Sequence, residues 1–211
     1  MNVNFESSKT LAIEGSVMLL LSLIPYVGWV LGIVGVVLLL RSMKEFSNYY
    51  QDEKIYQDSL TGVKYYIIAI IAAAVAIAAF TVGIWSATGF TSTFVLTTAF
   101  GVGLIAFIVG LVVAFVFYVL ASTHLKRTFY TLAQKTGEES FTTAGTLMWI
   151  GSILTIIGVG LILIFISWIF AIIGFSTMKS RQYQQYTPQP NGYGYTPPAQ
   201  PEQPKTTAGQ P

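Results

Sequence analysis

No Asp, Glu, Lys or Arg occurs between residues 65 and 125, which read YYIIAIIAAAVAIAAFTVGIWSATGFTSTFVLTTAFGVGLIAFIVGLVVAFVFYVLASTHL. A helix needs about 20 residues to cross a hydrocarbon core of about 30 Å, so this stretch is long enough for two crossings and a loop. The loop is expected at residues 87–98, which are rich in Ser, Thr and Gly, with Trp85 and Phe90 where an aromatic belt would lie. The sequence therefore predicts two central membrane spans, at residues 64–86 and 97–121.

The composition of the whole chain indicates a protein that lies in a bilayer. Of the 211 residues, 54% are hydrophobic and 9% are charged, and the mean hydropathy is +0.65, whereas average soluble domains carry about 25% charged residues. So few charged groups can hardly cover a core of this size with a water-soluble surface. The absence of Cys excludes disulfide frameworks and thiolate metal sites. A net charge of +2 with no basic patch argues against nucleic acid as a partner.

Two further charge-free stretches, residues 15–40 and 140–178, flank the central spans. Each contains a helix-weakening break near its middle: Pro25 and Gly28 in the first, and Gly158 and Gly160 in the second. Two interpretations fit each stretch, a hairpin of two short helices or a single long, kinked helix. Two complete crossings need roughly 44 residues, so hairpins of this length would dip into the bilayer without crossing it fully.

The positions of the basic residues favour the hairpins. Lys and Arg near span ends mark the cytoplasmic side, and here they occur at Lys9, in residues 41–64, in residues 126–135 and from Lys179 onward, but not in residues 87–98. With hairpins, every Lys and Arg lies on one side of the membrane together with both termini, and we expect that side to be the cytoplasm. The expected fold is an all-α, polytopic helical bundle of the cell membrane, in which two central spans are flanked by two hairpin-like or kinked apolar segments.

Two short internal similarities predict an internal repeat. Residues 52–59 (DEKIYQDS) resemble residues 137–144 (GEESFTTA), because each is acidic, then aromatic, then small, and each leads into a membrane helix. Residues 41–44 (RSMK) likewise resemble residues 176–179 (STMK), where the two outer stretches end.

The charged linkers have helical patterns. Met43, Phe46 and Tyr50 fall at helical spacing in the first linker, which indicates either a helix lying on the membrane surface or a helix that extends out of the bilayer. In the second linker, Thr136 and Glu139 have the spacing of a capping box ahead of an apolar run. This spacing predicts that a helix begins there, with Thr136 as its N-cap.

The composition changes at Gln182, from which point Gln, Pro, Tyr, Gly and Thr dominate. We therefore divide the chain into a helical membrane domain, residues 1–181, and a disordered Pro/Gln/Tyr-rich tail, residues 182–211. The tail contains two PxxP matches, PAQP at residues 198–201 and PEQP at residues 201–204, which suit the groove of a protein partner. An inert, solubilising tail is the alternative.

Few residues suggest a chemical role. Glu14 is the one carboxylate embedded in apolar sequence. Within a bilayer such a group indicates a proton or cation path, and the alternative is a solvated position at the interface. His124 stands beside Lys126 and Arg127 at a helix end, which favours a surface position over a metal site. No catalytic set, cofactor site or metal site is predicted, so we expect no enzyme activity.

Small residues at four-residue spacing favour close packing of helices. Gly28 and Gly32 form a strict GxxxG, and Gly110 lies midway between Ala106 and Ala114. This spacing lets helix backbones approach where no hydrophobic force drives their association. Packing inside the chain is the first interpretation, and formation of a homo-oligomer is the alternative.

Motifs in both outer stretches resemble a known family, the uncharacterised archaeal and bacterial membrane proteins called DUF996. The resemblance is carried by residues 24–28 (IPYVG), 31–35 (LGIVG), 43–44 (MK), 49–53 (YYQDE), 141–145 (FTTAG) and 150–158 (IGSILTIIG). It covers residues 8–178 and leaves out the tail. The resemblance implies a multi-pass membrane protein, but it implies no activity, substrate or catalytic residue.

Taken together, these features favour a non-enzymatic structural or interaction protein of the membrane. Membrane lipid and a protein partner are its expected contacts, made through the surface linkers and the tail. The alternative is a small transporter or channel for an ion or solute, because broken helices and internal repeats recur in transporters.

Overall fold

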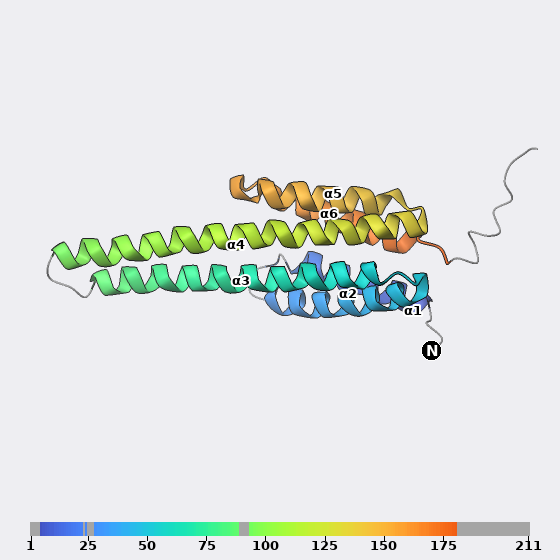
Figure 1. Ribbon diagram of the computed structural model, residues 1–211, viewed down its shortest axis with the longest axis horizontal. Helices are drawn as coiled ribbons and strands as arrows, with labels where there is room; N and C mark the ends of the chain where they lie inside the picture. Colours follow the sequence, from blue (N-terminus) through green and yellow to red (C-terminus); the bar gives the residue numbers. More distant parts are fainter. Residues whose placement is uncertain (1–4, 23, 25–27, 89–92, 181–211) are drawn as a thin grey trace, which may run out of the picture.

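The computed structural model describes residues 5–22, 24, 28–88 and 93–180, and in these residues it contains helices and no strand. The elements are α1 (Phe5–Leu21), α2 (Gly28–Tyr50), α3 (Glu53–Thr88), α4 (Thr93–Thr136), α5 (Glu139–Leu154), the 3-10 turn η1 (Thr155–Ile157) and α6 (Gly160–Thr177). The α helices form three consecutive antiparallel pairs (Figure 1). The predicted all-α bundle and the hairpin interpretation of both outer stretches are confirmed. The predicted break at Pro25 and the tail, residues 182–211, lie outside the described residues.

All three hairpins have their open ends at the same end of the bundle, which we call the charged end (Figure 1). The first and last described residues lie there, and Lys9 Nζ donates a hydrogen bond of 3.3 Å to the Met178 carbonyl oxygen. The six helices form a ring: each contacts the next along the chain, and α6 contacts α1. The ring therefore brings the two ends of the described part of the chain together.

The three hairpins differ strongly in length. At 1.5 Å per residue, α3 and α4, with 36 and 44 residues, measure about 54 and 66 Å, while α1 and α5, with 17 and 16 residues, measure about 26 and 24 Å. Because all three pairs start from the charged end, the α3–α4 hairpin continues alone beyond the tips of the other two (Figure 1). One half of the molecule thus contains six helices and the other half contains two.

The two central helices are long and apolar enough to cross a membrane, as are α5 with η1 and α6. The predicted spans at residues 64–86 and 97–121 fall within α3 and α4, and this prediction is confirmed. Beyond the tips of the short hairpins α3 and α4 expose large apolar side chains, such as Val82 at 63% and Ile105 at 64%. In water this surface would be unfavourable, whereas lipid tails solvate it.

The best-packed core lies at the charged end. Phe46 of α2, Phe129 of α4, Phe141 of α5 and Phe175 of α6 are at most 1% exposed, and the rings of Phe141 and Phe175 meet edge to face at 4.9 Å. Met43 and Tyr50 of α2 are buried in the same cluster. The interpretation of residues 43–50 as a helix on the membrane surface is therefore wrong. These residues continue α2 as one helix and pack against other helices.

The two connections at the charged end have similar geometry. Gln51 has φ +52° and precedes α3, and Gly137 has φ +75° and precedes α5. The Asp52 carboxylate accepts a hydrogen bond of 3.1 Å from the Lys54 backbone amide and so caps the N-terminus of α3. The equivalent N-cap of α5 is Glu138, so the predicted capping box at Thr136 is wrong: Thr136 ends α4, and its hydroxyl donates to the Leu132 carbonyl.

The geometry of the two connections aligns the predicted repeat one residue differently from the sequence comparison, which had paired residue 52 with residue 137. Counted from the two left-handed residues, Gln51 and Gly137, the position of Ile55 corresponds to that of Phe141, and both side chains are fully buried. The apolar anchor of each connection thus lies four residues after the turn. A repeat of the chain itself stays a prediction.

One ion pair joins the two connections. Lys135 Nζ lies 2.9 Å from Asp52 Oδ2, and its hydrogen bond holds the pKa of the Asp52 carboxyl below the usual value. A lowered pKa means that the pair stabilises the fold fully above about pH 4 and that this contribution is lost as the pH falls through the lowered pKa.

Candidate functional site

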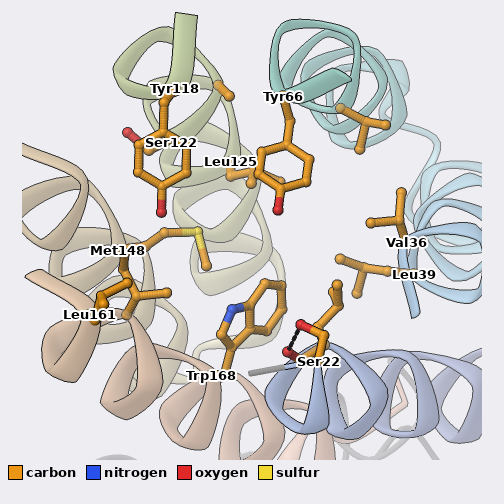
Figure 2. Close-up of a pocket in the computed structure, with 14 residues that line it drawn as sticks. Ser22, Val36, Leu39, Tyr66, Tyr118, Ser122, Leu125, Met148, Leu161 and Trp168 are labelled. Atoms are coloured by element: carbon orange, nitrogen blue, oxygen red, sulfur yellow. Dashed lines mark hydrogen bonds between the residues drawn. The ribbon is translucent and has the colours of Figure 1, made fainter. Parts of the chain in front are cut away.

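A partly open cavity of about 230 Å³ lies within the ring of helices, and all six helices contribute to its wall. Figure 2 shows its lining, with Tyr66 of α3 and Tyr118 of α4 on one side and Trp168 of α6 on the opposite side. The cavity borders the core of the charged end, because Leu39, Trp168 and two other core residues also line it. It is thus a cup in the six-helix half of the molecule, with the packed aromatic core next to it.

Small residues allow the short hairpins to close around the cup. In the first hairpin a Cβ at Gly15 would lie 2.9 Å from the backbone nitrogen of Leu39, and a Cβ at Gly35 would lie 2.8 Å from the carbonyl oxygen of Gly15. In the second hairpin a Cβ at Gly151 would lie 3.0 Å from the carbonyl oxygen of Gly160. The approaches at Gly15 and Gly35 are closer than real Cβ atoms show, and a Cβ at Gly151 would require its neighbours to shift, so glycine lets both hairpins pack this closely.

The polar groups of the cavity are uncharged. The hydroxyl groups of Tyr66 and Tyr118 point into the cavity, and the indole nitrogen of Trp168 lies on its cavity side (Figure 2). Ser122 and Ser152 share a hydrogen bond of 2.6 Å between their hydroxyl oxygens, and Ser22 donates to the Leu19 carbonyl. No Asp, Glu, Lys, Arg or His is among the described residues that line the cavity. Its wall can accept apolar groups and donate a few hydrogen bonds to an uncharged ligand.

The predicted packing glycines lie at helix contacts within the chain. Gly28 begins α2, where a Cβ would collide with the Ser22 carbonyl, and a Cβ at Gly32 would lie 3.3 Å from the Ser22 Cβ. A Cβ at Gly110 would lie 2.6 Å from the Ala76 Cβ, where α3 and α4 cross. Each of the three sites therefore has an intramolecular neighbour that explains its glycine.

The two glycines predicted to break the last stretch form its turn. Gly158 ends η1 in a left-handed conformation, with φ +82°, which favours glycine because it lacks Cβ. Gly160 begins α6 directly against α5, and a Cβ there would collide with the Gly151 carbonyl oxygen and the Thr155 amide nitrogen. The turn therefore needs glycine for two different reasons, backbone conformation at one position and close approach at the other.

The two ionisable residues singled out in the sequence do not meet. Glu14 is exposed on α1 and forms no salt bridge with another described residue. His124 is partly buried rather than on the surface, with its side chain 20% exposed and its Nδ1 at 3.2 Å from Asp58 Oδ1. Among the described residues no three or more metal-binding side chains gather. Neither residue lines the cavity.

Sequence reasoning missed Tyr66, Tyr118 and Trp168 as cavity residues. The apolar surroundings of Tyr118 and Trp168 resemble the rest of the spans, and Tyr66 follows Lys64 at the start of a span without any pattern that distinguishes it. The one signal was their ability to form hydrogen bonds within an apolar stretch, because buried Tyr and Trp usually find a partner for their polar atom.

The fold defines a polytopic helical membrane protein, and its six-helix half contains a partly open, largely apolar cavity. The chain belongs to the family described as "Protein of unknown function (DUF996)", whose model matches residues 31–169. It is similar to a curated protein of Methanocaldococcus jannaschii that is itself described as uncharacterized. The two are 30% identical over 166 residues, which is 78% of this chain and 89% of the relative. No solved structure matches the chain.

Proposed function

We propose that this protein is a non-enzymatic structural protein of the cell membrane that expands one leaflet of the bilayer. The observation that carries the proposal is the unequal length of the hairpins. Measured from the charged end, the two long helices extend far enough to cross the hydrocarbon core of about 30 Å, whereas α1 and α5 are about half as long as α3 or less. By themselves α5 with η1 and α6 are long and apolar enough to span a membrane, but they start at the charged end beside α3 and α4, so their tips end well before those of the long helices (Figure 1). Six helices therefore displace lipid near the charged end, and two helices displace lipid at the other.

The charged end is proposed to face the cytoplasm. Every Lys and Arg of the chain lies outside residues 65–125, and residues 87–98 at the opposite end contain none. Basic residues near span ends are retained on the cytoplasmic side during insertion. With this orientation, the cytoplasmic leaflet holds the larger cross-section, both termini are cytoplasmic, and the membrane is expected to bend with that leaflet on its convex side.

The tail and the surface of the linkers are proposed to contact lipid or a protein partner. Seven of the eight prolines lie in residues 182–211, and both PxxP matches are found there. A tail that leaves the bundle at the charged end would reach partners on the cytoplasmic side, so the same face would carry the expanded leaflet and the recruitment segment.

The depth of the hairpin tips tests the proposal directly. Because the chain contains no Cys, a single Ile157→Cys at the tip of the α5–α6 hairpin can carry a fluorophore in reconstituted vesicles. We expect it to be quenched most strongly by nitroxide groups deep in the acyl chains and to resist membrane-impermeant thiol reagents from both sides. Trp85→Cys, near the far end of α3 and 80% exposed, is expected to be quenched by nitroxides near the far headgroups.

Tyr130→Cys is the matched control, because Tyr130 is 53% exposed at the charged end and is expected to react with aqueous reagent from that side. If Ile157→Cys reacted from the far side as fast as Trp85→Cys, the short hairpins would cross the bilayer and the proposal would fail. The size distribution of the vesicles gives a second measurement, since an expanded leaflet should favour smaller vesicles or tubules as the protein-to-lipid ratio rises.

A transporter for a small uncharged solute is the second candidate, and the cavity within the ring of helices favours it. An uncharged polyol is the appropriate probe, because the cavity wall holds hydroxyl groups and no charged residue among those described. Under this candidate, vesicles with the full chain should swell in glycerol faster than empty vesicles. Ala121→Phe, at a 2% exposed position on the cavity wall, should abolish the difference. Equal swelling of empty and protein-containing vesicles would contradict transport of this solute.

A further inference from the structure

A second hollow lies on the outside of the bundle at the charged end. It is a groove of about 760 Å³ between the beginning of α3, the end of α4 and α5. The residues that matter for its chemistry are Lys54 and Asp58 of α3, Lys126, Arg127 and Tyr130 of α4, and Trp149 of α5. The sequence showed no basic patch, because Lys54 and the adjacent pair Lys126 and Arg127 come from two separate segments that the fold brings together.

The groove has an excess of positive charge. It contains three cations and one carboxylate, and that carboxylate, Asp58, is already engaged by His124 at 3.2 Å. None of Lys54, Lys126 and Arg127 forms a salt bridge with another residue in the described part of the chain. An anion can therefore bind these cations without displacing a protein carboxylate.

Two aromatic residues give the groove the character of a membrane interface. The Lys126 ammonium lies 4.4 Å from the centroid of the Trp149 ring, a cation–π contact that holds the charge at the groove wall. Tyr130 is 53% exposed at the same groove. Trp and Tyr are enriched where lipid headgroups meet the hydrocarbon, so these rings favour a site at that level.

The apolar surface next to the groove would suit lipid chains. Lys126 directly follows the charge-free stretch of residues 65–125, so the groove lies where the apolar part of α4 ends. On the side of the hydrocarbon, α4 and α5 expose Leu120 at 40% and Ile153 at 38%. A ligand with an anionic group in the groove could lay its chains along this surface.

We propose that the groove binds the headgroup of an anionic phospholipid. The Arg127 guanidinium donates to phosphate oxygens in the fork geometry that suits them, and Lys126 and Lys54 add point charges. Basic pockets between membrane helices on the cytoplasmic side bind anionic headgroups in this way. The inference rests on the proposed function in one respect, because the bundle must lie in the bilayer with this groove at the headgroup level.

Native mass spectrometry of the full chain in detergent micelles tests the inference, with dioleoylphosphatidylglycerol as the anionic probe and dioleoylphosphatidylcholine as the zwitterionic one. We expect preferential retention of phosphatidylglycerol. Each neutralised cation should weaken that binding about five-fold, which corresponds to about 1 kcal/mol. The double variant Lys126→Gln/Arg127→Gln should therefore lose about 25-fold and approach the affinity for phosphatidylcholine. Lys54→Gln, on a different helix and exposed, should lose about five-fold by itself.

Arg41→Gln is the matched control. Arg41 lies at the charged end on α2, its side chain is 70% exposed, and it does not line the groove, so phosphatidylglycerol binding should be unchanged. Equal retention of the two lipids, or an equal loss in Arg41→Gln and Lys54→Gln, would overturn the inference. If inorganic phosphate at the same concentration displaced the lipid, the groove would be a site for phosphate, and the conclusion that it binds a phospholipid would be wrong. None of these outcomes depends on the depth of Ile157, so failure here is distinguishable from failure of the proposed function.

Discussion

Phe175→Ala is expected to destabilise the protein by about 3–5 kcal/mol, the cost of removing a large aromatic side chain from a packed core. Phe175 is fully buried on α6, and its ring lies 4.9 Å from that of Phe141 and stacks at 6.1 Å on that of Phe46. The substitution therefore leaves a cavity where α2, α4, α5 and α6 meet. Unfolding by sodium dodecyl sulfate in mixed micelles, followed by circular dichroism, measures the loss.

Phe165→Ala is the control for this prediction. Phe165 lies on the same helix, but its side chain is 40% exposed toward the surface. Because lipid or detergent covers this surface, removal of the Phe165 ring should lower the free energy of unfolding by well under half of the loss expected for Phe175→Ala. Equal destabilisation by the two substitutions would contradict the placement of the packed core at the charged end.

Gly160→Ala is expected to destabilise the second hairpin by about 3 kcal/mol or more, at the upper end of the cost of overpacking. The added Cβ would collide with the carbonyl oxygen of Gly151 and the amide nitrogen of Thr155. Both are backbone atoms, which cannot rotate away as a flexible side chain can. The α5–α6 turn must therefore open, and the wall that Leu161 and Ile164 give the cavity must move with it.

Gly101→Ala provides the comparison, because no atom beyond its own stretch of α4 lies within 4 Å of the position where its Cβ would be built. Alanine is the better helix former, so this variant should retain or slightly increase stability. Proteolysis of the folded protein in detergent gives an independent measurement: faster cleavage near residues 151–160 is expected for Gly160→Ala alone. If Gly160→Ala had the same unfolding transition as the unmodified protein, the close contact described between α5 and α6 at this turn would be contradicted.

The membrane spans and the hairpins could be predicted because they depend on local composition. A charged side chain is costly inside hydrocarbon wherever it points, so the limits of residues 65–125 bound the central spans without knowledge of any neighbour. Gly158 and Gly160 likewise interrupt the last stretch through local backbone conformation and close approach. The positions of Lys and Arg then favoured hairpins over single long helices.

The linkers show where local patterns were insufficient. Met43, Phe46 and Tyr50 have the spacing of an apolar helix face, but that spacing is the same for a face on lipid and a face on protein. Their burial against Phe129 and Phe175 depends on α4 and α6, which come much later in the chain. Thr136 and Glu139 had the spacing of a capping box, whereas the left-handed turn at Gly137 placed the N-cap at Glu138.

The amino-acid sequence by itself determined that the chain lies in a membrane, where its long spans run and which side of each hairpin is charged, because the free energy of placing a residue in lipid depends mainly on that residue. Only the tertiary structure decided that six helices close into a ring, that Tyr66, Tyr118 and Trp168 face one cavity, and that Lys54, Lys126 and Arg127 share one groove. The physical reason is that a membrane helix is apolar on all sides. Hydrophobic periodicity then cannot distinguish the face that packs on protein from the face that meets lipid.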